Sequence, residues 1–494
     1  MTSISIVSRL WQRCTELEKA VSTWLPHPLE RNPHTLARAP DRLPRFVRDS
    51  PVAMRYLNLL APLNWPNFPE RDLHCYRFCP PVPYAPFAAA CLVKLEEQKP
   101  YLTKLREYLV EHPPLIWVLG FPLVPCRSTP WGFNPDASLP SARHLTRMLR
   151  QMPNTKGQFL LDETVHLLQT ELQSVCQGFG QVISLDTKHI LAWVKENNPK
   201  AYVSDRYDKT RTLSGDPDCR LGCKRKRNQG KDSPPDPATP YANPKPASGI
   251  QVSEYYWGYA SGVVVTKLPD WGEFVLAELT QPFDAPDVSY FSPLMQDTER
   301  RLGFRPRYGT FDAAFDAFYV YAHFHRDGHP WQHAFAAVPW AKRGSRRKFD
   351  AEGLPLCKAG LPMPLKSTFM NRTSFVAHER GRYGCPLQFP EPTADACPID
   401  DPHWENGGCT TTMATSIGAR LRFQIDRKSK LYKAIYNQRS AAERINSQAK
   451  ALGIERPYLR NRQAITNQNT LIYALINLKA LHRIQEQKAN ARDL

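Results

Sequence analysis

The sequence predicts a mixed α/β protein: a sheet flanked by helices, with a helical region before it and an insertion before the last helices. Three observations predict this fold class. Apolar residues recur at helical spacing through residues 1–175. Within residues 176–340, segments rich in Val, Tyr, Phe and Thr alternate with helical segments. Residues 341–425 contain few periodic segments and many Pro and Gly, before a strongly helical end over residues 426–494.

The N-terminal region is expected to hold several helices with basic residues between their apolar positions. The clearest candidates cover residues 86–98, 99–112 and 141–152. Pro140 and Ser141 are favourable residues for starting the last of these helices. Three arginines repeat along the same helix: Arg143, Arg147 and Arg150. Their spacing places them on one face, which suits either contact with DNA or an ordinary solvated basic face.

The central region is expected to form the sheet. Strand-like segments cover residues 181–185, 257–267, 273–280, 305–311 and 333–339, and helical segments cover 289–303 and 313–325. Three strands, a helix, a strand, a helix and a strand follow one another, which predicts a mixed sheet covered by helices. Residues 205–250, which include the basic run KRKR, are expected to form a mobile loop because Pro, Asp, Lys and Gly dominate them.

The charge balance favours a polyanionic partner. The chain has 65 Lys and Arg residues against 47 Asp and Glu, a net charge of +18, which favours nucleic acid before membrane. No apolar run reaches about 18 residues, so no membrane span is expected. The N-terminal residues 1–21 are patterned as an amphipathic helix and lack the apolar core of a signal peptide. The 12 scattered cysteines are typical of a reduced, cytoplasmic protein.

Residues 427–452 carry the strongest helical pattern in the chain. Tyr436, Arg439, Glu443 and Lys450 lie on this predicted helix, with 2, 3 and 6 residues between them. At about 100° per residue, the four side chains fall within about 60° of arc. A phenol, two cations and a carboxylate on one stripe exclude a core face. They could form a solvated face with an ion pair between Arg439 and Glu443, or a functional surface.

The spacing Tyr-x2-Arg-x3-Glu-x6-Lys resembles the signature of DDE-type transposases of bacterial insertion sequences, which cut DNA and paste it elsewhere. The sequence matches all four positions, and the resemblance covers about residues 85–480. It implies a ribonuclease H-like catalytic domain with three metal-binding carboxylates. It also implies that the preceding helical region reads the terminal repeat, and that one pocket performs both 3′-end cleavage and strand transfer.

Three carboxylates match the order and the settings that the resemblance requires. The first is Asp186, which directly follows the strand-like segment 181–185. The second is Asp312, at the end of a later strand-like segment. Asp316, expected one turn into the next helix, is the alternative to it. The third is Glu443, which the predicted C-terminal helix would bring to the two aspartates from far along the chain.

The chemistry explains why carboxylates are needed. In-line attack on a phosphodiester requires a deprotonated water or 3′-hydroxyl, and it requires neutralisation of the charge in the transition state. Two divalent cations about 3.5–4 Å apart supply both. Mg²⁺, with Mn²⁺ as a substitute, prefers the hard oxygen atoms that carboxylates offer. No protein nucleophile is needed, so no covalent intermediate is expected.

The resemblance also implies DNA contacts and partners. It implies that Tyr436, Arg439 and Lys450 contact the transposon end, where arginine offers a planar fork to phosphate and lysine a point charge. The expected partners are double-stranded DNA, as terminal inverted repeats and as target, and a second copy of the chain on paired ends. Two alternatives remain: a nuclease of the same fold that cuts without joining, and an inactive DNA-binding derivative of a transposase.

Four cysteines lie in the insertion: Cys357, Cys385, Cys397 and Cys409. They could build a structural Zn²⁺ site that holds a loop-rich segment together. Their spacing lacks the close CxxC pair that is typical of such sites, so scattered reduced thiols are the alternative.

Overall fold

The structure is a computed structural model. It describes eight stretches of the chain: residues 31–72, 82–173, 176, 178–225, 253–325, 334–340, 347–393 and 395–492. The expected N-terminal amphipathic helix lies outside the described residues, as does most of the expected basic loop. Among the described helices, none combines the length and the apolar character needed to cross a membrane.

Short helices and turns make up the described part of the N-terminal region. They are α2 (Pro33–Ala37), α3 (Arg45–Arg48), α4 (Pro51–Leu60), α5 (Tyr84–Glu96), α6 (Leu102–Glu111), α7 (Pro113–Val118), α8 (Pro135–Ser138) and α9 (Ala142–Gln151). α5 lies at their centre and is buried along almost its whole length. α9 begins where the sequence predicted, because the Ser141 side-chain oxygen accepts the N–H of His144 at 3.2 Å. Its predicted basic face is exposed.

The sheet is mixed. Its strands are β1 (Val182–Leu191), β2 (Arg220–Arg225), β3 (Ser253–Leu268), β4 (Gly272–Pro282), β5 (Tyr308–Thr310) and β6 (Phe335–Ala337). The main order is β4-β3-β1-β5-β6: β4, β3 and β1 pair antiparallel, whereas β1, β5 and β6 pair parallel. The expectation of an unbroken loop over residues 205–250 was wrong at β2, which is held by pairing with the first half of β3.

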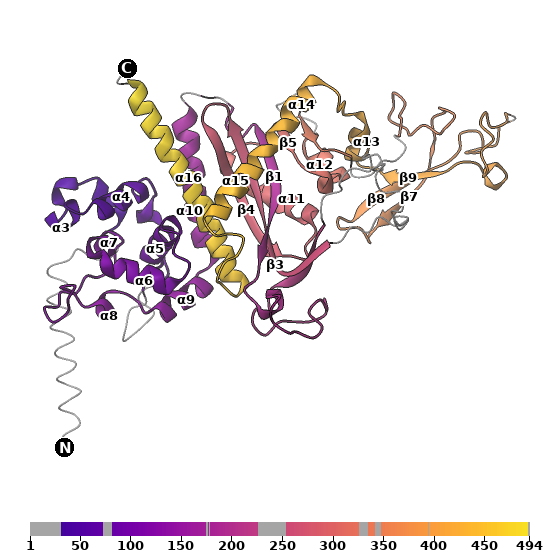
Figure 1. Cartoon of the computed structure of the whole chain (residues 1–494). Coiled ribbons are helices and arrows are strands. Elements are labelled where there is room, and N and C mark those ends of the chain that lie inside the picture. Colours follow the sequence, from indigo (N-terminus) through magenta and orange to yellow (C-terminus); the bar gives the residue numbers. More distant parts are fainter. Residues whose placement is uncertain are drawn as a thin grey trace, which may run out of the picture.

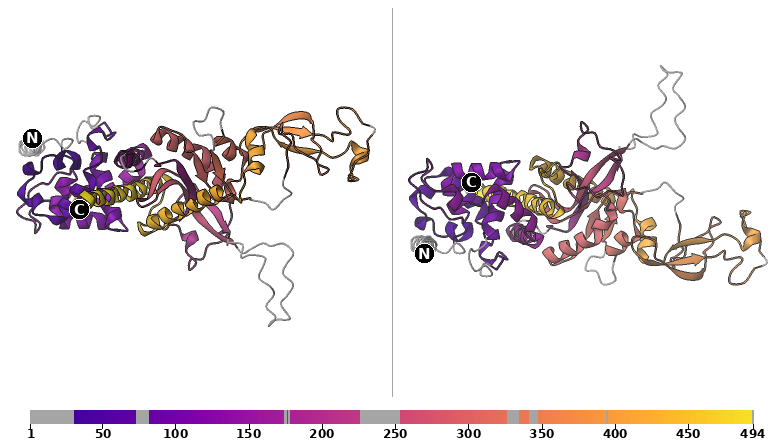
Figure 2. Two further views of the ribbon diagram at one scale, coloured as in Figure 1. Left: turned by 90° about the horizontal axis from the view of Figure 1, so that it is seen from above. Right: turned by 90° about the horizontal axis from the view of Figure 1, so that it is seen from below.

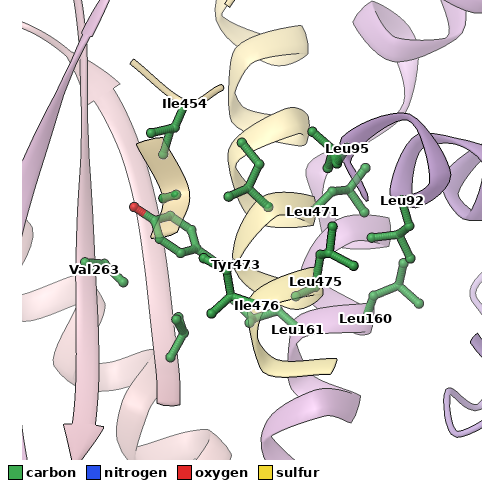
Figure 3. Close-up of a cluster of buried hydrophobic side chains, with 14 of the residues drawn as sticks. Leu92, Leu95, Leu160, Leu161, Val263, Ile454, Leu471, Tyr473, Leu475 and Ile476 are labelled. Carbon is green, nitrogen blue, oxygen red and sulfur yellow. The ribbon is translucent and has the colours of Figure 1, made fainter. Parts of the chain in front are cut away.

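Helices cover both faces of this sheet. The remaining helices are α10 (Asn154–Gln173), α11 (Phe291–Leu302), α12 (Phe318–His323), α13 (Ile417–Gln424), α14 (Lys430–Tyr436), α15 (Ser440–Ala451) and α16 (Arg462–Arg492). Gly262 in β3 faces the α11 side, where an added Cβ would lie 2.4 Å from the ring of Tyr290. The next residue, Val263, points the other way, toward Tyr473 of α16 (Figure 3). The predicted mixed α/β architecture is thus confirmed.

α16 joins the N-terminal helices to the sheet through a single hydrophobic core. Its Leu471 and Leu475 point toward α5 and α10, whereas Tyr473 and Ile476 point toward the sheet (Figures 1 and 3). Asn477 fixes the register of the contact, because its side-chain amide both donates to and accepts from the backbone of Val275 at 2.8 Å. The helical region and the sheet therefore share one interior.

The insertion forms a small sheet of its own. Its strands β7 (Leu365–Asn371), β8 (His378–Tyr383) and β9 (Thr411–Ala414) pair antiparallel in that order. This sheet projects from the end of the molecule opposite to the N-terminal helices (Figure 2). The element nearest to it in the chain, α13, packs against α12 and so ties its base to the main body.

Candidate active site

The sequence predicted Asp186 at the end of a strand. In the structure it lies inside β1. Its parallel neighbour β5 pairs only with residues 182–184, but the antiparallel pairing with β3 continues to Leu191. The long strand β3 therefore keeps β1 extended past Asp186, which pairs with Val263. Asp186 is thus held on a strand at the point where the parallel half of the sheet stops.

The carboxylate of Asp186 is largely buried and has partners from two elements. The side-chain amide Nδ2 of Asn446 in α15 donates to Oδ2 at 3.1 Å. Burial raises the pKa of Asp186 to about 6, against a hydrogen bond from the Thr187 backbone that lowers it. The negative charges of Asp312 and Glu443 raise this pKa further, and the positive charge of Arg439 lowers it. Four predicted site residues therefore act on one another electrostatically.

Asp312 follows β5 by two residues, as predicted. It precedes a 3₁₀ turn over Ala313–Phe315, and its Oδ1 accepts the N–H of Ala314 at 2.8 Å. The side chain is half-buried. Because that bond occupies one oxygen with a local donor only, the carboxylate keeps capacity for a further ligand.

Asp316 has a structural role that its position in sequence does not reveal. Its side chain is fully buried, and Arg422 of α13 binds both carboxylate oxygens, with Nε at 2.7 Å from Oδ1. The hydroxyl of Tyr321 donates to the same oxygen at 2.8 Å. The predicted helix over 313–325 is accordingly broken, because Asp316 leaves helical geometry (ψ 69°) between the 3₁₀ turn and α12. These contacts favour Asp312 as the site residue.

The predicted helix over 427–452 is two helices. A 3₁₀ turn, Asn437–Arg439, separates α14 from α15, and the Ser440 hydroxyl donates to the Asn437 carbonyl at 3.1 Å in competition with helical bonding. α14 packs on β5 and β6, the turn on β1, and α15 on β1, β3 and β4. The segment thus crosses the sheet, with its turn over the strand that carries Asp186.

Glu443 and Arg439 form the ion pair that their spacing allowed. Arg439 Nη2 lies 2.6 Å from Glu443 Oε1, and the Glu443 side chain is 45% exposed. An exposed pair of this kind contributes at most about 1 kcal/mol to stability. The positive charge of Arg439 also lowers the pKa of Asp186, so this guanidinium acts on the first predicted carboxylate as well as on the third.

Tyr436 and Lys450 have partners within the chain. The ring of Tyr436 stacks on that of Tyr432, with centroids 5.9 Å apart and planes 9° apart. Lys450 Nζ lies 3.0 Å from Glu455 Oε2, although its side chain is 63% exposed. Tyr436 is therefore part of the packing of α14 in this structure, whereas Lys450 presents its charge at the surface.

Two polar contacts near the site were missed by the sequence analysis. The first is made by Asn446, which is buried and lies three residues after Glu443. Its sequence signal is a polar residue on the apolar face of the predicted helix. Asp287 accepts a hydrogen bond from the Thr187 hydroxyl at 3.0 Å. Burial raises the pKa of Asp287, and the negative charge of Asp312 raises it further. Side chains alternate along β1, so Asp287 lies on the face opposite to Asp186, and no pattern in the sequence predicts it.

The donor set of the three predicted carboxylates suits a hard cation such as Mg²⁺ or Mn²⁺. Among the described residues, no group of three or more His, Cys, Asp and Glu side chains lies close enough to hold a metal ion. Glu443 is turned toward Arg439. The arrangement therefore has the chemistry of a metal site, with its carboxylates coupled by charge and not gathered around one point.

Three of the four insertion cysteines lie near one another. Cys385 and Cys409 continue the β8–β9 register beyond the Tyr383–Thr411 pair, which places them opposite each other. Their thiols share a hydrogen bond, and burial raises the pKa of Cys409 to about 12, with further contributions from Cys385 and Cys357. All four are free thiols. No contact of Cys397 with the other three is found in the described part of the chain.

Comparison with models of known protein families found no match to the chain. Comparison with curated proteins found none that is significantly similar. The function of the chain therefore rests on its residues and their geometry.

Asp186→Asn is expected to stabilise the metal-free protein near pH 8 and to change little near pH 4. The pKa of Asp186 in the folded chain is about 6, whereas an unfolded aspartate titrates near about 3.9. The folded state therefore loses stability, by about 3 kcal/mol at most, as the pH rises through these values and the buried carboxylate ionises. Asn is neutral and avoids this loss. Thermal unfolding of both proteins in EDTA across this range measures it, and a pH-independent difference would contradict the assignment.

Asp316→Ala is expected to lower the free energy of unfolding by about 2–3 kcal/mol, because it removes a fully buried carboxylate that accepts hydrogen bonds from Arg422 and Tyr321. Asp312→Ala removes one hydrogen bond at a half-buried turn and should cost about 1 kcal/mol or less. Urea unfolding of the two variants compares these costs. Equal losses would show that the two aspartates do not differ in role as their contacts indicate.

Proposed function

We propose that this chain is a DDE-type DNA transposase, with Asp186, Asp312 and Glu443 as its catalytic, metal-binding carboxylates. One observation carries the proposal. The three carboxylates come from separate segments of the chain, yet burial and the charges of the other two together raise the pKa of Asp186. The helix that carries Glu443 also contacts Asp186 directly, through the hydrogen bond from Asn446, and perturbed, coupled carboxylates are typical of functional sites.

The topology supports a ribonuclease H-like domain. Such domains have a central strand with two antiparallel strands on one side and two parallel strands on the other. The order β4-β3-β1-β5-β6 has this form. Asp186 lies on the central strand, Asp312 follows its parallel neighbour, and Glu443 comes from α15, which packs on β1, β3 and β4. These are the settings that the resemblance requires of the three carboxylates.

Asp186, Asp312 and Glu443 would hold the divalent cations, Mg²⁺ or Mn²⁺. When bound, such cations neutralise charge on the phosphodiester and activate the attacking water or 3′-hydroxyl. The chain itself contributes ionised carboxylates and a nearby guanidinium. Arg439, held beside Glu443, offers a planar fork that matches phosphate, and Lys450 offers an exposed point charge.

DNA is the proposed partner, bound as terminal repeats and as target by a dimer on paired ends in the bacterial cytoplasm. The net charge of +18 supports a polyanionic partner. The exposed arginines of α9 add a basic face in the helical region. A contribution from phosphate contacts of this kind weakens as salt concentration rises.

The test uses the full chain and a plasmid that carries its gene with the flanking DNA. With Mg²⁺ we expect cuts at two positions that bracket the gene. Asp312→Ala should abolish cleavage, because it removes a metal ligand, and leave binding to the flanking fragments in a gel-shift assay largely unchanged. Asp297→Ala, at a partly exposed aspartate of α11, is the matched control. Cleavage by Asp312→Ala at the wild-type rate would overturn the triad.

A joining assay separates the transposase from a nuclease of the same fold. Flanking fragments with pre-cut 3′ ends are incubated with a supercoiled target plasmid and Mg²⁺. A transposase joins them to the target, and a nuclease leaves them unjoined. Binding without any cleavage by the wild-type chain would instead indicate an inactive DNA-binding derivative.

A further inference from the structure

Asn446 makes a hydrogen bond between α15 and the carboxylate of Asp186. It lies on α15, one turn after Glu443, and its Nδ2 donates to Asp186 Oδ2 at 3.1 Å. The two residues are 260 positions apart in the chain. Residues three apart share a helix face, so Asn446 and Glu443 approach the sheet together.

The other end of the Asn446 side chain has no hydrogen-bond partner among the described residues. The residue is 7% exposed, and its Oδ1 is buried. A buried, unsatisfied polar atom costs about 1–3 kcal/mol, and few are found in folded proteins. The buried neighbours on the same helix, Ala442, Ile445 and Ala449, are apolar. An apolar residue at position 446 would suit this packing better than an amide.

We propose that Asn446 is a positioning residue of the active site: its amide holds Asp186 Oδ2 and so fixes the placement of Glu443 relative to Asp186. This inference rests on the proposed function. Catalytic groups must be held within about 0.5 Å of their working geometry, and rigid elements do this best. The contact ties a helix to a strand through one oxygen of Asp186. The Asn446 amide thus donates to Asp186 through Nδ2, although its Oδ1 accepts no hydrogen bond from the described residues.

The test replaces Asn446 by Leu, which has a similar shape and no donor. Asn446→Leu should change the melting temperature little, because loss of the unsatisfied oxygen offsets loss of the hydrogen bond to Asp186. It should keep the affinity for flanking DNA, lower kcat of cleavage by about 10–100-fold, and raise the Mg²⁺ concentration for half-maximal rate. Asn446→Ala, which cannot overpack the site, should lose activity to the same extent per folded molecule.

Asn469 provides the matched control. It is also fully buried, donates one hydrogen bond to the Thr280 hydroxyl at 2.8 Å, and has an unpartnered Oδ1, but it lies on α16 and binds no site carboxylate. Asn469→Leu should shift the melting temperature only, with the kcat per folded molecule and the Mg²⁺ requirement unchanged.

The outcomes separate this inference from the proposed function. Wild-type cleavage that both Asn446 variants retain, per folded molecule and at the same Mg²⁺ concentration, overturns the positioning role and leaves the transposase proposal intact. Activity that falls only in proportion to the folded fraction also overturns it, because that is the behaviour of a structural residue. A wild-type chain that cuts no flanking DNA, or an Asp312→Ala variant that cuts it normally, overturns the proposed function.

Discussion

The buried charge of Asp186 is the constraint on which the rest of the site depends. A carboxylate inside a strand is costly, and it persists because donors and a cation approach it from other elements. Asn446 reaches it from α15, Arg439 acts on it from the 3₁₀ turn, and the Thr187 backbone adds a hydrogen bond. Asn446 and Arg439 come close to Asp186 because the segment of α14 and α15 crosses the sheet.

Local patterns predicted much of this arrangement, and long-range pairing decided the remainder. The start of α9 at Ser141 follows from capping chemistry within three residues. The strands near Asp312 and the helical stripe with Glu443 are likewise short-range signals. The extension of β1 beyond Asp186 depends on β3, more than 70 residues later, and no window of the sequence contains both.

The same distinction explains what the sequence left open in the site. Asp312 and Asp316 are four residues apart and were hard to separate, since what distinguishes them is Arg422, which lies 106 residues beyond Asp316. The 3₁₀ turn at Asn437–Arg439 coincides with a hydrogen bond from the Ser440 hydroxyl to the Asn437 carbonyl. The cysteines of the insertion are widely spaced in sequence, yet the β8–β9 register sets Cys385 opposite Cys409.

The shared core around α16 has a mechanical consequence. Because one helix packs on α5, α9 and α10 and also on β4, the basic face of α9 and the carboxylates of the sheet belong to a single stiff body. Under the proposed function, a DNA duplex bound at α9 would lie at a constant distance from Asp186. The distance from the bound sequence would then determine the cleavage position, and no recognition of the bases at the cleaved bond would be needed.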